Sequence, residues 1–205
     1  MNSLYQKIWS EAKPYYLTSR PMDVKHIEWF IEMVETICQI EKLDESLLMP
    51  LAILHDVGYA TLTNPKTANY YDKDIRRAHM KAGAEIAEKI LKQVKYPDDK
   101  SKKIIEYIGI HDNWAFGEVD MYLQDNILGT FKDFDYLWIY TKIGFDAIKI
   151  VLKKNDLQML QHLKDEVSPI HGKKPFSSNY TKELRESYLK EREKDLHITF
   201  KKNIP

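Results

Sequence analysis

Apolar residues recur at three- and four-residue steps along most of the chain. Between positions 27 and 38, for example, they fall on one face of a helix that follows Pro21, with Asp23 as its expected N-cap. A second helix is expected over 46–57, with Pro50 in its first turn and Gly58 as its stop. Further helices are expected over about 76–94, 97–110, 131–153, 157–167 and 179–196.

The sequence shows no pattern typical of β-strands. No run of alternating apolar and polar residues is flanked by hairpin turns, so the sequence predicts an all-α bundle. The polar stretch 60–75 is expected to be a long loop, and 113–125 to be irregular. A Pro- and Gly-containing stretch near residue 170 predicts a helical domain over 1–168. Residues 169–205 would then be a linker and a C-terminal helix that packs on this domain.

Composition narrows the class of protein. The chain has 205 residues, of which 43% are hydrophobic and 30% charged, which is typical of a globular domain. Lys and Arg balance Asp and Glu at 31 each, so nothing indicates binding to a nucleic-acid polymer or an anionic membrane. The single cysteine, Cys38, falls on an apolar stripe and is expected to be buried. With no signal peptide or membrane span in the pattern, we expect a soluble, cytoplasmic protein.

His55 and Asp56 interrupt the apolar pattern at the end of the helix expected over 46–57. An ionised aspartate at this place faces the negative end of the helix dipole, so its burial needs a compensating cation. A metal ion supplies one, and His and Asp are both ordinary ligands of zinc, iron and manganese. The pair therefore indicates a candidate metal site.

More residues of these types stand at or near the ends of other expected helices: His26, His79, His111 and Asp135. In a helical bundle, residues from several helix ends meet in one pocket. Each also has a structural alternative. His26 and His79 would be surface residues, His111 would pair with Asp112, and Asp135 would be a charge favoured at a helix N-terminus.

The order His, His-Asp and a distant Asp resembles that of the HD-domain metal-dependent phosphohydrolases. The resemblance covers roughly residues 20–150 and rests on the stretches 51–58, 79–87, 108–112 and 133–137. It implies that His26, His55, Asp56 and Asp135 hold a principal metal ion. His79 and His111 would bind a second ion or contact the substrate phosphate, and Asp56 could bridge two ions. One or two ions of Fe, Mn, Ni, Co, Zn or Mg are implied.

The expected activity is hydrolysis of a small phosphorylated metabolite or nucleotide, with Asp56 as a catalytic residue. Three cations near ligand positions are candidates to hold substrate phosphate, although each could equally be a surface charge: Arg76, Arg77 and Lys142. A regulatory module that binds a nucleotide without turnover is an alternative, and a di-iron oxygenase is a third. A homodimer is left open.

The chain also departs from the family pattern. The Gly-Tyr-Pro extension of the cyclic-dinucleotide phosphodiesterases is missing, and Trp138 stands where many relatives carry a second acid. Asp112 replaces the His or small polar residue expected after His111. Because Asp133 precedes Asp135 by two residues, the sequence leaves open which of them is the last ligand.

Overall fold

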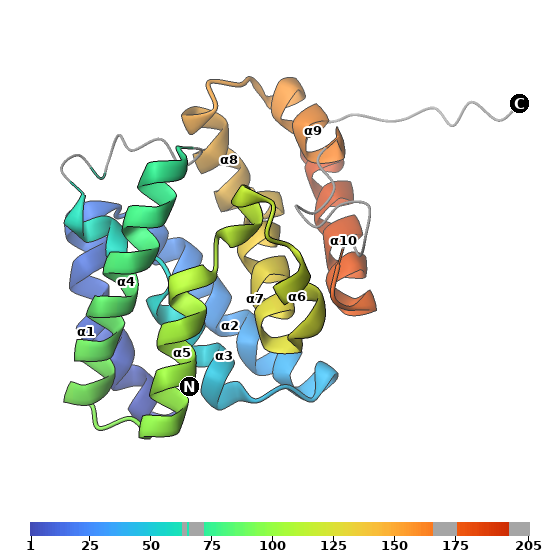
Figure 1. Ribbon diagram of the computed structural model, residues 1–205. Coiled ribbons are helices and arrows are strands. Elements are labelled where there is room, and N and C mark those ends of the chain that lie inside the picture. The colour runs from blue at the N-terminus through green and yellow to red at the C-terminus, as the bar shows by residue number, and fades with distance from the viewer. Residues whose placement is uncertain (63–64, 66–71, 166–175, 197–205) are drawn as a thin grey trace, which may run out of the picture. The chain divides into compact units, whose positions relative to one another are not determined.

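The computed structural model describes residues 1–62, 65, 72–165 and 176–196, and every regular element among them is a helix (Figure 1). The elements divide between two compact units, Met1–Lys132 and Asp133–Pro205. The all-α prediction is therefore confirmed. The expected boundary at residue 168 stays a prediction, and most of the expected loop and linker lie outside the described residues.

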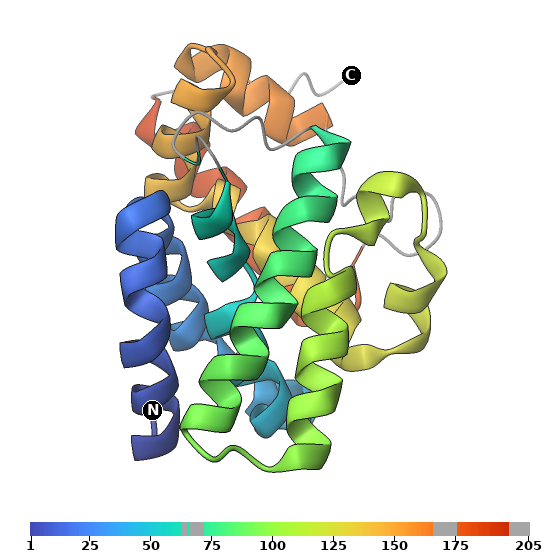
Figure 2. The same ribbon diagram turned by 60° about the vertical axis from the view of Figure 1, so that its left-hand side comes forward.

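The first unit contains two packed pairs of helices, with further helices and 3-10 helices around them. The elements are α1 (Ser3–Ser19), α2 (Asp23–Glu41), α3 (Glu45–Leu54), the 3-10 helix η1 (Val57–Thr61), α4 (Lys73–Gln93), α5 (Asp98–Ile110), the 3-10 helix η3 (Asn113–Phe116) and α6 (Asp120–Gln124). α2 packs on α3, and α4 packs on both α5 and η1. α4 and α5 run side by side in both views (Figure 1, Figure 2).

The N-terminal helix α1 was not foreseen from the sequence. Its buried positions Tyr5, Ile8, Ala12 and Tyr16 follow helical spacing, and the Asn2 side chain caps its first turn by accepting from two backbone N–H groups. The Tyr16 hydroxyl donates to the carbonyl oxygen of Ile53 at 2.7 Å. This bond fixes α1 against the end of α3, directly before His55.

Two expectations about the helix starts were wrong. Asp23 is the first residue of α2 rather than its N-cap, and its carboxylate forms an ion pair with Arg20, with Oδ2 2.8 Å from Nε. α3 begins at Glu45, where Asp44 caps the N–H of Ser46, so Pro50 lies inside the helix beyond its first turn. Burial of the surrounding apolar side chains offsets the backbone hydrogen bond that Pro50 cannot make.

α3 also ends earlier than expected. Its last residue is Leu54, and Gly58 lies within η1 rather than at the helix stop. The region 113–125, expected to be irregular, contains η3 and the short helix α6.

The second unit contains the end of α7 (Asn126–Leu137), η4 (Trp138–Tyr140), α8 (Lys142–Val151), α9 (Asp156–Asp165) and α10 (Asn179–Asp195). The continuous helix expected over 131–153 was wrong. Thr141 adopts an extended conformation, and its hydroxyl caps the N–H of Gly144 at 3.0 Å, which starts α8 as a new helix. The carbonyl of Leu163 accepts from both Tyr140 and Arg185, joining η4, α9 and α10.

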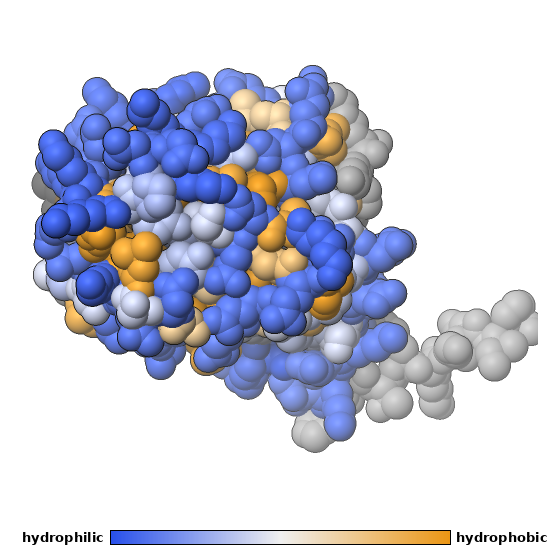
Figure 3. Space-filling view, turned by 90° about the horizontal axis from the view of Figure 1, so that it is seen from below, coloured by the Kyte–Doolittle hydropathy of each residue, from blue (hydrophilic) through white to orange (hydrophobic). Residues whose placement is uncertain are grey.

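The exterior agrees with the charged composition. On the face drawn in Figure 3, hydrophilic side chains dominate and apolar ones form small separated patches. Within the part of the chain that the structure describes, no helix combines the length and apolar character needed to cross a membrane.

Candidate metal centre

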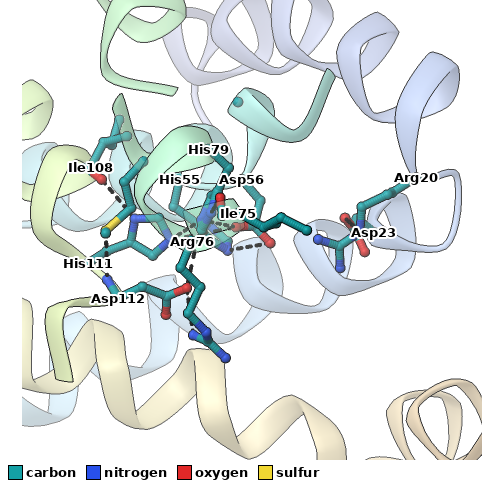
Figure 4. Close-up of polar contacts among 12 residues, drawn as sticks. Arg20, Asp23, His55, Asp56, Ile75, Arg76, His79, Ile108, His111 and Asp112 are labelled. Carbon is teal, nitrogen blue, oxygen red and sulfur yellow. Dashed lines mark hydrogen bonds and ion pairs between the residues drawn. The ribbon is translucent and has the colours of Figure 1, made fainter. Parts of the chain in front are cut away.

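His55 and Asp56 occupy the junction between α3 and η1. His55 caps the C-terminus of α3, with its ring fully buried, and its Nδ1 lies 3.0 Å from the carbonyl oxygen of Ala52. Asp56 has φ −100° and ψ 4°, which ends the α-helix and starts the 3-10 helix. The change of helix type directs two consecutive polar side chains toward the centre of the first unit (Figure 4).

The same local structure recurs where α5 meets η3. His111 caps the C-terminus of α5, and its Nδ1 lies 2.8 Å from the carbonyl oxygen of Ile108. Asp112 has φ −104° and ψ 10°, close to the values at Asp56, and a 3-10 helix follows. The first unit thus contains two helix–His–Asp–3-10 junctions.

His79 lies in the second turn of α4 and is fully buried. Its Nδ1 lies 3.3 Å from the carbonyl oxygen of Ile75. A carbonyl oxygen only accepts hydrogen bonds, so these backbone contacts place a proton on Nδ1 of His55, His79 and His111. In the neutral rings, Nε2 then carries the lone pair, which is the arrangement of a metal-binding histidine.

The Nε2 atoms of His79 and His111 lie 3.2 Å apart. Asp56 Oδ1 lies 3.5 Å from the first and 3.6 Å from the second. Two ligand atoms about 2.1 Å from one ion and separated by a tetrahedral angle would be about 3.4 Å apart. Two facing lone pairs beside a carboxylate repel one another unless a cation lies between them. The donor set Asp56, His79 and His111 therefore fits a divalent metal ion.

Electrostatics keep these groups in the protonation states that metal binding needs. Burial raises the pKa of Asp56, but its interactions with His55 and His111 and the charge of Arg20 outweigh it and hold the pKa well below its usual value. Burial and the proximity of His111 lower the pKa of His79 to about 4. Near neutral pH, Asp56 is a carboxylate and His79 is neutral.

His26 belongs to the same buried cluster. It lies in the first turn of α2, is 5% exposed, and its ring centroid is 5.4 Å from that of His55. The surface positions considered for His26 and His79 from the sequence are therefore wrong. The structure brings His26, His55, Asp56, His79 and His111 together inside the first unit.

Close backbone packing places His79 beside Asp56. A Cβ atom on Gly58 would lie 1.9 Å from the carbonyl oxygen of His79 and 2.5 Å from the backbone nitrogen of Gly83, so only glycine allows this contact between η1 and α4. The next residue, Tyr59, stacks on the His79 ring at 4.1 Å, and the Arg20 guanidinium lies 4.0 Å from the Tyr59 ring.

The proposed phosphate-binding cations lie in different surroundings. Arg76 is buried and pairs with Asp112 at 2.7 Å. The Arg77 side chain is 62% exposed and lies over the Phe116 ring at 4.4 Å, beside an open pocket of about 540 Å³. Lys142 is exposed in the second unit and forms an ion pair with Asp146. Of the three cations, Arg76 is thus the one that is buried, and its partner Asp112 lies beside His79.

The two aspartates between which the sequence could not decide also differ. Asp133 is buried, and its Oδ2 accepts from the backbone and hydroxyl of Ser177 and from the hydroxyl of Thr181. These contacts give Asp133 a structural role within the second unit, where it holds the start of α10. Asp135 lies two residues later in α7, and its role as a ligand stays a prediction.

Sequence reasoning missed several residues around the cluster. Asp112 was noted only as a departure, although its His-Asp context repeats that of Asp56. Tyr59 lies in η1, three residues after Asp56. Lys132 is 1% exposed, and its Nζ lies 4.3 Å from the Trp114 ring. A lysine on the apolar face of an expected helix is a signal that could have identified it.

A family model described as the HD domain matches residues 24–138, which is more than half of the chain. This range contains all five residues of the buried cluster, as well as Asp135. Neither the comparison with curated proteins nor that with solved structures gave a match.

Proposed function

This chain belongs to the HD domain family, and we propose that it is a metal-dependent hydrolase of phosphate esters. The family consists generally of metal-dependent phosphohydrolases. The observation that carries the proposal is the pair of Nε2 atoms of His79 and His111, which face each other beside Asp56. The proposed substrate class is a small phosphorylated metabolite or a nucleotide.

Each residue of the cluster has a role in this proposal. His79, His111 and Asp56 would hold one divalent ion. His26 and His55 would hold a principal ion together with Asp56, and the family resemblance adds Asp135 to that set. Nδ1 contacts to backbone carbonyls fix the rings of His55, His79 and His111, so that their Nε2 atoms are already oriented as ligands.

A divalent ion held by these residues would supply Lewis-acid chemistry, lowering the pKa of a bound water molecule and polarising a phosphoryl oxygen. Asp56 would orient the attacking water and accept a hydrogen bond from it, since its low pKa keeps it a carboxylate. Arg76 pairs with Asp112, which in turn lies next to His79. Its positive charge would attract the phosphate group. The cluster is buried, which strengthens these electrostatic interactions.

The test is phosphate release from a panel of phosphomonoesters, phosphodiesters and nucleotides. Protein loaded separately with Mn, Fe, Co, Ni, Zn or Mg is compared with His55→Ala and Asp56→Asn. We expect activity with at least one metal and a loss of at least 100-fold in both variants, because each removes a ligand. The exposed Asp99→Asn serves as the matched control and should retain wild-type activity.

Two results would contradict the proposal. Metal-loaded protein that hydrolyses none of these substrates, or variants as active as the wild type, would remove its basis. Nucleotide binding without turnover would favour the regulatory module, and oxygen uptake by iron-loaded protein would favour the oxygenase. The cytoplasmic location and the homodimer stay predictions.

A further inference from the structure

Two buried cations approach a single tryptophan next to the metal centre. The Arg76 guanidinium on α4 lies 4.8 Å from the Trp114 ring, and Lys132 Nζ on α7 lies 4.3 Å from the same ring. Arg76 is 8% exposed and Lys132 is 1% exposed. The ring therefore holds two positive side chains from different helices close to each other.

Asp112 connects these cations to the His/Asp cluster. Its Oδ2 pairs with Arg76 Nη1 at 2.7 Å and lies 3.7 Å from His79 Nε2 (Figure 4). Its Oδ1 accepts from Trp114 Nε1 at 3.0 Å. Its backbone N–H points to the Met80 sulfur at 3.3 Å, which fixes the junction further. Arg76 and Asp112 thus lie beside His79, and Lys132 contacts the tryptophan whose indole N–H binds Asp112.

Both cations act on the same small region. Arg76 and Lys132 both contact the Trp114 ring, and Arg76 also pairs with the Asp112 carboxylate. Bringing Lys and Arg together in a region of low dielectric is costly unless negative charge accompanies them. A phosphate dianion brought to the adjacent metal centre would add such charge.

The 3-10 helix η3, which carries Trp114, borders a pocket that is open to solvent. Trp114 is only partly buried, and Asn113 and Phe116 of the same 3-10 helix line the pocket of about 540 Å³. Arg77 lies over Phe116 as Arg76 lies over Trp114, so two consecutive arginines of α4 hold η3 in place. The Trp114 side chain is therefore held in place beside the cluster by Asp112 and Arg76.

We propose that Arg76 and Lys132, held by Trp114, form a subsite for the terminal phosphate dianion of a phosphomonoester. This inference rests on the proposed phosphohydrolase function and assigns Lys132 and Trp114 to substrate recognition. Arg76, whose Nη1 pairs with Asp112, would offer its remaining guanidinium N–H groups to phosphate oxygens, and Lys132 would supply a second, point-like charge. A diester, with one negative charge instead of two, gains less from the second cation.

The test measures binding of inorganic phosphate to Mn-loaded full-length protein by calorimetry. Lys132→Met keeps most of the side-chain volume but removes the charge, and we expect it to weaken phosphate binding at least tenfold. Lys132→Arg should bind within about threefold of the wild type. Lys102→Met removes a charge from an exposed lysine and should bind as the wild type does.

The metal content of every variant is measured alongside phosphate binding, and we expect it to be unchanged because neither Lys132 nor Trp114 is a ligand. If Lys132→Met does not fold, Trp114→Leu replaces it and should cause a similar loss of phosphate affinity. If a phosphomonoester is hydrolysed, Lys132→Met should raise its KM and reduce the preference for it over a diester.

These outcomes separate the subsite from the proposed function. Phosphate binding that depends on Lys132 supports the subsite even if no ester is hydrolysed. The subsite is overturned if Lys132→Met, or Trp114→Leu in its place, binds phosphate as tightly as the wild type, or if phosphate does not bind the metal-loaded wild type. Hydrolysis by the wild type would leave the proposed function standing in either of those cases.

Discussion

At the scale of single residues, Asp112 connects polar side chains from two other elements at the edge of the cluster. It contacts Arg76, Trp114 and the edge of His79, while its own charge is maintained against burial by neighbouring positive side chains. Removing this carboxylate would leave a buried guanidinium without its partner. The free energy of unfolding should therefore respond to Asp112 more strongly than to any exposed aspartate.

We expect Asp112→Asn to lower the free energy of unfolding by about 3 kcal/mol at pH 7 in the metal-free protein. The pKa of Asp112 is lowered in the folded state, so its contribution is present above the ordinary aspartate pKa of about 4 and is lost as pH falls through the folded value. Urea denaturation at pH 7 and pH 3 measures the change. A cost that is equal at both pH values, or no larger than that of Asp99→Asn, would contradict this account.

Cys38 provides a second test at a single residue. It is 7% exposed in α2, and burial, with the nearby charge of Glu45, raises the pKa of its thiol to about 12. Since the thiolate is the reactive form, almost none is present at pH 8. We expect a disulfide reagent to modify native protein at least 100-fold more slowly than protein unfolded in urea. Equal rates would mean that the thiol is accessible and ionised in the fold.

At the scale of elements, most helices could be predicted because their apolar faces repeat with helical period over many residues. The failures fall where local side-chain bonds override that period. Thr141 caps a new helix within the run 131–153, and Asp44 starts α3 early enough to place Pro50 in its interior. Such caps depend on side-chain conformations that apolar spacing does not specify.

The contact between η1 and α4 leads to an element-scale prediction. Gly58→Ala would place a methyl group against backbone atoms of His79 and Gly83, and we expect a loss of about 3 kcal/mol in stability together with weaker metal binding. Gly109→Ala is the matched control, because a Cβ atom there meets nothing within 4 Å and alanine favours the helix by about 1 kcal/mol. Thermal melting and calorimetric metal titration measure both effects. A Gly58→Ala protein as stable as the wild type would rule out the close packing.

At the scale of the whole molecule, the candidate ligands within the first unit come from helices that are distant in the sequence. His26 belongs to α2, His55 and Asp56 to the end of α3, His79 to α4 and His111 to the end of α5. The sequence identified these residues because His and Asp interrupt apolar stripes at helix ends and because their order resembles a known family. Lys132 could not be identified in this way, since its contact with Trp114 becomes apparent only when α7 and η3 are placed together.

Because the ligands are dispersed in the unfolded chain, a metal ion binds the folded state almost exclusively. At a free metal concentration 100 times the Kd, this linkage stabilises the fold by about 2.7 kcal/mol, which for a chain of this size raises Tm by about 5–10 °C. A chelator should reverse the shift, and Asp56→Asn should reduce it by more than half, because this variant removes the carboxylate shared by both histidine groups. Differential scanning calorimetry across a metal concentration series measures the effect. A Tm that does not depend on metal concentration would argue against a metal centre, whatever the activity assays show.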